Sequence, residues 1–152
     1  MTPTPTTSDD NSPAPAMAEL KMRAEDADDV LVLSALLQDS LISASDLIYD
    51  STQASFMVVA NRYCWEAEQD GQKWRRLCGI RIGHVTRVRH QNVTDLSGTF
   101  YNLLSLSYDE AENSLSFIFS DDARIKCHIE RLNIVLKDMA PPHPSLSTPS
   151  HD

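Results

Sequence analysis

The sequence predicts an α+β domain that consists mostly of antiparallel β-sheet, with about seven strands and one N-terminal amphipathic helix. Three observations support this. One segment has helical periodicity, the segments after it alternate between apolar and polar residues, and all eight prolines lie outside residues 19–139. The loops between the expected strands are of hairpin length, which favours antiparallel pairing. We therefore expect a partly closed barrel or a two-layer sheet with the helix on one side.

The prolines also mark the expected ends of the domain. Both flanking segments are rich in Pro, Ser and Thr and poor in large apolar residues. Such segments bury too little apolar surface to offset the entropy lost on ordering. We predict a disordered tail at residues 1–18, a single globular domain at residues 19–139 and a second disordered tail at residues 140–152.

The predicted helix spans residues 25–40, "EDADDVLVLSALLQDS", and a short strand is expected just before it at residues 20–24. Asp26 is the expected N-cap, and Asp28 and Asp29 suit the positive end of the helix dipole. The apolar residues cover more than half of the helix circumference: Val30, Leu31, Leu33, Leu36 and Leu37. Such a helix packs against a sheet and has apolar surface left for a second contact, so a homo-oligomer remains an alternative.

Most of the remaining chain is predicted to form strands. The four residues at 51–54, "STQA", separate two strand-like segments and indicate a hairpin, as do residues 109–114, "DEAENS". In residues 124–138, "RIKCHIERLNIVLKD", the apolar positions change parity, which indicates a bulge or corner near Arg131.

Residues 73–90, "KWRRLCGIRIGHVTRVRH", contain six Lys or Arg and no acid in a chain of formal net charge −9. On one continuous strand, Arg75, Arg81, Arg87 and Arg89 would share a face, opposite a core face. Arginine suits bidentate contact with carboxylate or phosphate, so this face is a candidate binding surface for an acidic protein surface or an anionic small molecule. The alternative is a solvated strand face that pairs with nearby acids. A turn at Gly83 would change this alternation.

Catalytic and metal-binding signatures are not found in the sequence. There is no GxSxG motif and no glycine-rich phosphate loop, and the chain has only four glycines. Cys64, Cys78 and Cys127 lack the spacing of a zinc module and fall on apolar strand faces, which indicates buried free thiols. We expect no catalytic residue, no metal and no cofactor, and we lean against enzymatic activity.

Composition also limits the compartment and the partners. No apolar run approaches 18 residues, and the first 18 residues lack the pattern of a secretory signal. With three cysteines and no CxxC spacing, a disulfide framework is not expected, so we predict a cytoplasmic protein that does not contact a membrane. The net charge of −9 argues against nucleic acid as the partner.

Four segments together resemble a known family: "LKMRAEDADDVLVLSALLQDSLI", "FMVVANRYCWE", "RRLCGIRIGHVTRVR" and "IKCHIERLNIVLKDM". Their order and content are similar to the small bacterial proteins of domain-of-unknown-function family 2948, over residues 20–139. Tyr63 and Cys64 depart from the Phe-Asp that the family tends to have. The resemblance implies a cytoplasmic bacterial protein without an assigned activity, and it offers no catalytic residues.

Three functions remain in competition. The leading one is a non-enzymatic binding or adaptor domain that uses the arginine face. The first alternative is a small ligand-binding protein or enzyme with a pocket between helix and sheet. The second is nucleic-acid binding through the arginines, which the net charge of −9 disfavours.

Overall fold

The structure is a computed structural model that describes residues 17–70, 72–94 and 98–145. Its elements follow one another as β1 (Lys21–Ala24), α1 (Ala27–Leu37), β2 (Leu41–Ser43), the 3-10 helix η2 (Ala44–Asp46), β3 (Leu47–Asp50), β4 (Ser55–Tyr63), the 3-10 helix η3 (Trp65–Asp70) and β5 (Trp74–Ile82). The remaining strands are β6 (Val85–Gln91), β7 (Phe100–Asp109), β8 (Ser114–Phe119), β9 (Arg124–Ile129), β10 (Ile134–Asp138) and β11 (His143–Pro144). The fold is α+β with one α-helix in the described residues, as predicted.

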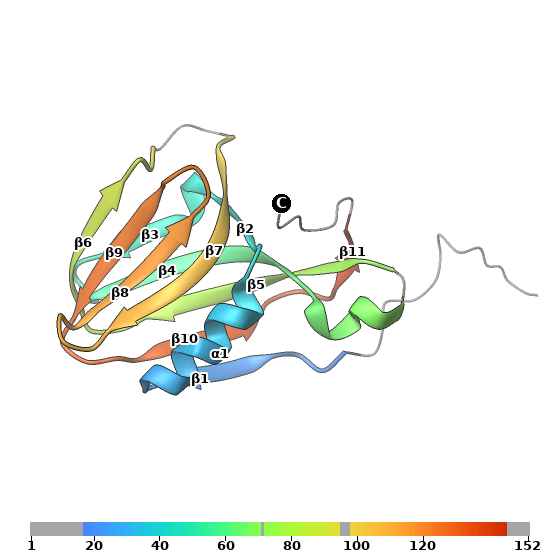
Figure 1. The fold of residues 1–152 in the computed structure, drawn as a ribbon, viewed down its shortest axis with the longest axis horizontal. Coiled ribbons are helices and arrows are strands. Elements are labelled where there is room, and N and C mark those ends of the chain that lie inside the picture. The colour runs from blue at the N-terminus through green and yellow to red at the C-terminus, as the bar shows by residue number, and fades with distance from the viewer. Residues whose placement is uncertain (1–16, 71, 95–97, 146–152) are drawn as a thin grey trace, which may run out of the picture.

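The strands form one 11-stranded sheet, more than the seven expected, in the order β1-β10-β5-β4-β2-β7-β8-β9-β6, with β3 added to β4 and β11 to β5. The pairs are antiparallel, and the predicted hairpins β3–β4 and β7–β8 are confirmed. The sheet curls around an apolar core but does not close into a barrel (Figure 1). As a result β6 ends one edge of the sheet and β1 ends the other.

Helix α1 begins where the sequence places its cap. The Asp26 Oδ1 accepts a hydrogen bond from the Asp29 amide at 2.8 Å, and the Asp29 carboxylate accepts one from the Glu25 amide at 3.0 Å. These bonds satisfy amides at the helix start that have no partner within the helix. The helix ends at Leu37, earlier than expected, because Gln38 has extended backbone angles of φ −55° and ψ 133°.

One side of α1 is buried and the other is open. Val30, Leu33 and Leu37 face the core, while Leu31 and Val32 are 68% and 50% exposed. The helix lies against β7 and next to β1 (Figure 1). No helix within the described ranges is long and apolar enough to cross a membrane.

The core lies between the two curled halves of the sheet. Phe56 of β4 meets Phe117 of β8 edge-on, with ring centroids 5.8 Å apart. The three cysteines are free and buried, as predicted: Cys64, Cys78 and Cys127. Burial raises the pKa of Cys64 to about 11 and that of the other two thiols to about 12. All three are therefore kept as neutral thiols at physiological pH.

Two changes of direction shape the sheet. The predicted corner near Arg131 is confirmed, because residues 124–138 form β9 and β10, which lie far apart in the strand order. The second is at Gly83 and His84, where the expected continuous strand divides into β5 and β6. His84 has a left-handed backbone with φ 56°, and Gly83 donates its amide to the Asn133 carbonyl at 2.9 Å. The chain thereby leaves the β4–β5–β10 layer and joins β9.

The C-terminal boundary also needs correction. Residues 140–145 were predicted to be a disordered tail, but β11 pairs with β5, and Ser145 donates its amide to the Lys73 carbonyl at 2.8 Å. Backbone hydrogen bonds order this segment. The prediction is based on apolar content, which does not report backbone hydrogen bonds. The parts of the predicted tails at residues 1–16 and 146–152 lie outside the described residues.

Candidate functional site

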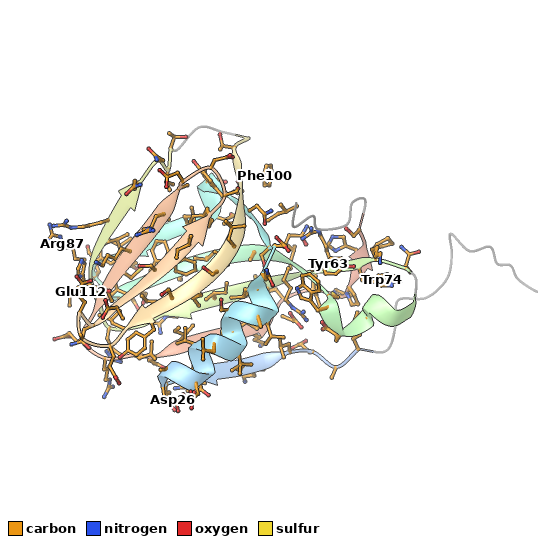
Figure 2. All side chains as sticks on the ribbon, in the orientation of Figure 1. Asp26, Tyr63, Trp74, Arg87, Phe100 and Glu112 are labelled. Carbon is orange, nitrogen blue, oxygen red and sulfur yellow. The ribbon has the colours of Figure 1, made fainter. Side chains whose placement is uncertain are left out.

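The four arginines predicted to share one exposed face occupy three different environments. Arg75 is buried, with 5% of its surface exposed. Arg81 is exposed on the outer face of β5, and Arg87 and Arg89 are exposed on β6. In Figure 2, Arg87 projects from one end of the molecule, and Tyr63, over whose ring Arg75 lies, is toward the other end. The expected single stripe is absent for two reasons. Arg75 is buried over the Tyr63 ring although it has the same parity on β5 as Arg81, and the turn at Gly83 and His84 separates β5 from β6.

A buried arginine cluster, formed by Arg62 and Arg76, is located where β4 and β5 meet β10 and the C-terminal segment. Arg62 has no exposed side-chain surface, and its Nε and Nη2 donate to the two carboxylate oxygens of Asp138 at 2.9 and 3.0 Å. Its Nη1 and Nη2 also donate to Glu66, at 3.1 and 2.9 Å. Arg62 is thus held between two carboxylates, both in bidentate geometry.

This ionic network extends to the backbone just before β1 and just after β10. Asp138 accepts a hydrogen bond from the Leu20 amide at 2.7 Å and lies 3.5 Å from the Nε of Arg76. The same Nε donates to the Ala140 carbonyl at 2.7 Å. Burial alone would lower the pKa of Arg62, but its hydrogen bonds to Asp138 and Glu66 outweigh burial and raise that pKa above its usual value. Arg62 therefore remains charged, and the network fastens β1 and the C-terminal segment to the sheet.

Arg75 serves the fold as well. Its Nη1 donates to the carbonyls of Asp39 and Asn61, each at 3.1 Å, and its guanidinium carbon lies 5.6 Å from the centre of the Tyr63 ring. Burial lowers the pKa of Arg75. With its side chain buried and aimed at two carbonyls of the same chain, Arg75 is not positioned to meet a partner, contrary to the prediction from strand alternation.

Arg87 and Arg89 belong to a surface that we call the cationic face, defined as Arg87, Arg89, Arg124 and Lys126. In the register between β6 and β9, Arg87 is opposite His128, Arg89 opposite Lys126, and Gln91 opposite Arg124. Directly opposed residues of an antiparallel pair share one face of the sheet. The intervening pair, Val88 and Cys127, points inward, since Cys127 is fully buried. The cationic face is therefore the outer surface of an edge strand and its neighbour.

In the described residues, one acid forms an ion pair on this surface. Glu112, from the turn between β7 and β8, forms an ion pair with Lys126, and the hydrogen bond from Lys126 lowers the pKa of Glu112. Within the described part of the chain, Arg87, Arg89 and Arg124 form no ion pair. A shallow hollow of about 270 Å³ lies between Arg89 and Arg124 and is also lined by Lys126. The face thus presents three guanidinium groups without an ion pair among the described residues, and two of them, those of Arg89 and Arg124, line the hollow.

Arg81 lies on a different surface. It is opposite Met57 of β4 on one side and Val135 of β10 on the other, and Met57 is 38% exposed. A hollow of about 280 Å³ in this surface is lined by apolar side chains together with Arg81 and Lys137. Apolar residues separate the cations here, whereas on the cationic face they are adjacent.

Sequence reasoning missed two members of the cationic face, although a signal was present. In "RIKCHI" the apolar residues Ile125, Cys127 and Ile129 alternate, so Arg124, Lys126 and His128 had to point outward together. What no local pattern contains is the pairing of β9 with β6, which joins these cations to Arg87 and Arg89.

One alternative function requires a pocket between helix and sheet. In the structure, Val30, Leu33 and Leu37 of α1 are buried at that position. A cleft of about 550 Å³ lies near the start of α1, and its charges are mixed, since it is lined by Arg23, Arg131, Glu110 and Glu130 among others. Across the described ranges, no three His, Cys, Asp or Glu side chains gather in a way that could hold a metal ion. On the cationic face, three of the four cations have no ion pair within the described residues.

Comparison with known proteins gives a family but no function. The model of a family described as "Protein of unknown function (DUF2948)" matches residues 20–151. A search of the curated proteins and a search of the solved structures found no match. The matched range takes in every strand of the sheet together with helix α1, and the chain belongs to the DUF2948 family.

Proposed function

We propose that this protein is a non-enzymatic binding domain whose cationic face contacts an acidic surface of another protein. The observation that carries the proposal is the register between β6 and β9, which sets Arg89 opposite Lys126 and Arg87 opposite His128. The acidic surface would supply the carboxylates that the fold does not.

The arrangement is unfavourable for the isolated domain. Like charges placed directly opposite each other on a sheet destabilise it by roughly 0.2–1 kcal/mol per pair. A chain of net charge −9 has acids enough to neutralise four cations, yet among the described residues only Glu112 forms an ion pair on this face. The positive patch also opposes the sign of the whole chain, so it directs an acidic partner to one orientation.

The chemistry of the face favours carboxylates on a protein over nucleic acid. Single-stranded nucleic acid is usually held by aromatic side chains interleaved with cations. The outward positions of β6 and β9 hold Arg87, Arg89, Gln91, Arg124, Lys126 and His128, with no Phe, Tyr or Trp among them. The hollow of about 270 Å³ suits a few carboxylate side chains, and it would also accept a small anion, which the experiment must distinguish.

The test measures binding of a fluorescein-labelled decaglutamate peptide by fluorescence anisotropy at low salt. The charge-reversal triple R87E/R89E/R124E is compared with R23E/R81E/K137E, which changes the net charge equally at exposed positions of β1, β5 and β10. We expect binding by wild type and by the second triple, at least about tenfold weaker binding by the first, and weakening of all binding by salt.

Three outcomes would overturn the proposal. Wild type that fails to bind the peptide removes the basis for an acidic partner. An equal loss in both triples means that affinity follows net charge and not the cationic face. Inorganic phosphate or duplex DNA that displaces the peptide at concentrations far below competing glutamate assigns the face to phosphate chemistry. Circular dichroism melts of both triples verify that each variant is folded.

A further inference from the structure

We propose that the acidic partner binds as an additional β-strand along β6, in the gap between β6 and β3, and that its residues alternate between acidic and apolar. This inference rests on the proposed function and specifies how the cationic face is used. It is carried by the shape of the gap, by the unpaired edges on both sides of it, and by the alternation of side chains along β6.

The gap exists because the curled sheet fails to close. Among the described residues, β6 pairs only with β9, and β3 pairs only with β4. The two edges are joined at one end, where the Val85 amide donates to the Ala54 carbonyl at 2.8 Å and the Tyr49 hydroxyl donates to the Val85 carbonyl at 3.4 Å. Beyond that corner the strands separate, and β6 forms the edge of the curled sheet (Figure 1).

A cavity of about 200 Å³ occupies the gap. Leu47 and Tyr49 from the β3 side and Val88 and His90 from the β6 side line it, and its other lining residues include Phe56 and Ile125 of the core. This space therefore leads from the surface to the apolar interior. It is large enough for one or two apolar side chains and too narrow for a folded domain.

The backbone of an edge strand presents N–H and C=O groups that have no partner in the sheet, and an extended segment can pair with them. Many proteins protect such an edge with charged side chains or by covering it. On β6 the charges are Arg87 and Arg89, which repel another cationic edge but attract an acidic one. Pairing β6 with β6 of a second copy would place arginines beside arginines, so the occupant is a different, acidic chain.

Side-chain alternation gives the sequence of the occupant. Along β6 the cations Arg87 and Arg89 face outward, whereas Val88 points inward and His90 lines the gap. Neighbouring strands share the same pleat, with alternate residues about 6.6–6.8 Å apart on one face. An added strand with acids at alternate positions places them beside Arg87 and Arg89, and its intervening apolar residues enter the cavity.

The probe is a fluorescein-labelled seven-residue peptide of alternating Glu and Val, measured against wild-type protein by fluorescence anisotropy. Three peptides with the same side chains serve as controls. One has its four Glu and three Val in separate blocks. The other two keep the alternating order and carry N-methyl groups on alternate backbone amides, one peptide for each edge. We expect the alternating peptide to bind at least about tenfold more tightly than the block peptide, and at least one N-methylated form to lose binding.

Amide hydrogen exchange distinguishes strand addition from charge attraction, because charge attraction alone would not slow exchange of the β6 backbone amides. If the peptide adds a strand, amide exchange should slow in residues 86–91 of β6 when the alternating peptide is bound, and not when the block peptide is bound. Exchange in residues 21–24 of β1, at the other edge of the sheet, should stay unchanged and is the internal control.

The outcomes separate this inference from the proposed function. Equal binding of alternating, block and N-methylated peptides, abolished by R87E/R89E/R124E, refutes strand addition and leaves the cationic face as an acidic-protein site. If wild-type protein binds decaglutamate but does not bind the alternating peptide, strand addition is also refuted. If the triple leaves the binding of every peptide unchanged, the proposed function fails together with the inference.

Discussion

The buried arginine cluster and the cationic face contain the same type of side chain in two opposite roles. Arg62 is fully buried and shares bidentate contacts with Asp138 and Glu66, whereas Arg87 and Arg89 are exposed and form no ion pair within the described residues. Arg76, in the cluster, and Arg87 come from one short stretch of the chain. The comparison teaches that an arginine's role depends on whether the fold itself supplies its partners.

Desolvation explains the division. An ion taken out of water without compensation costs several kcal/mol, so a buried guanidinium persists only where carboxylates or carbonyls surround it. An exposed guanidinium keeps its water, and its contribution to folding is close to zero. The buried cluster should therefore dominate stability, while the cationic face should dominate binding.

The largest expected effect comes from removing one carboxylate of the buried cluster. D138N leaves the Arg62 charge with Glu66 alone, and we expect the free energy of unfolding to fall by about 3–5 kcal/mol. E112Q makes the same change of acid to amide at the partner of Lys126, and there we expect less than about 1 kcal/mol. Urea unfolding followed by circular dichroism measures both. A loss for D138N no greater than that for E112Q would contradict the structural role of the cluster.

The second comparison contrasts two arginines of the same strand, β5. R75M removes the donor to the carbonyls of Asp39 and Asn61, which should cost about 1–3 kcal/mol. R81M changes an exposed side chain beside Met57, and its effect should stay within about 0.5 kcal/mol. Thermal melts compare the stability of the two variants, and we expect the lower melting temperature for R75M. Equal melting temperatures would mean that Arg75 is no more a part of the fold than Arg81.

Much of the fold could be predicted from sequence because local patterns determine it. The Asp26 cap, the hairpins at residues 51–54 and 109–114, the corner near Arg131 and the buried cysteines depend on turn chemistry and alternation, and each is confirmed. The features that could not be predicted are contacts between residues distant in sequence. Arg62 meets Asp138 across 76 positions, and Arg75 reaches Asp39 across 36.

The candidate site was half predictable for the same reason. Alternation places Arg87 and Arg89 on one face, and it also places Arg124 and Lys126 on one face of a second strand. Neither pattern says that β6 and β9 are neighbours. The prediction from alternation also requires a strand that continues straight through Gly83. The left-handed backbone of His84, with φ 56°, shows that the strand turns there instead. Tertiary pairing decides which cations meet.

A smaller effect concerns acid stability. Burial alone would raise the pKa of Glu66, but its hydrogen bonds from Arg62 outweigh burial and lower it. A carboxyl whose folded pKa lies below its unfolded value, about 4.3, adds stability above that pH and loses it as pH falls through the folded pKa. Urea unfolding of wild type should therefore weaken more steeply below about pH 4 than that of E66Q. Because the Glu66 side chain is 39% exposed, we expect a difference below about 1 kcal/mol. Parallel pH profiles for the two proteins would contradict the pairing.

The smallest expected effect has the opposite sign. R89E on the cationic face puts a carboxylate opposite Lys126 and relieves the repulsion between two cations, so the free energy of unfolding should rise by roughly 0.2–1 kcal/mol. The same substitution should weaken binding of the decaglutamate peptide. R81E, whose cross-strand neighbours Met57 and Val135 carry no charge, should change neither quantity appreciably. A variant that gains stability as it loses binding identifies a residue kept for a partner at the expense of the fold. If R89E destabilises the protein instead, Arg89 belongs with Arg75 among the arginines that hold the structure together.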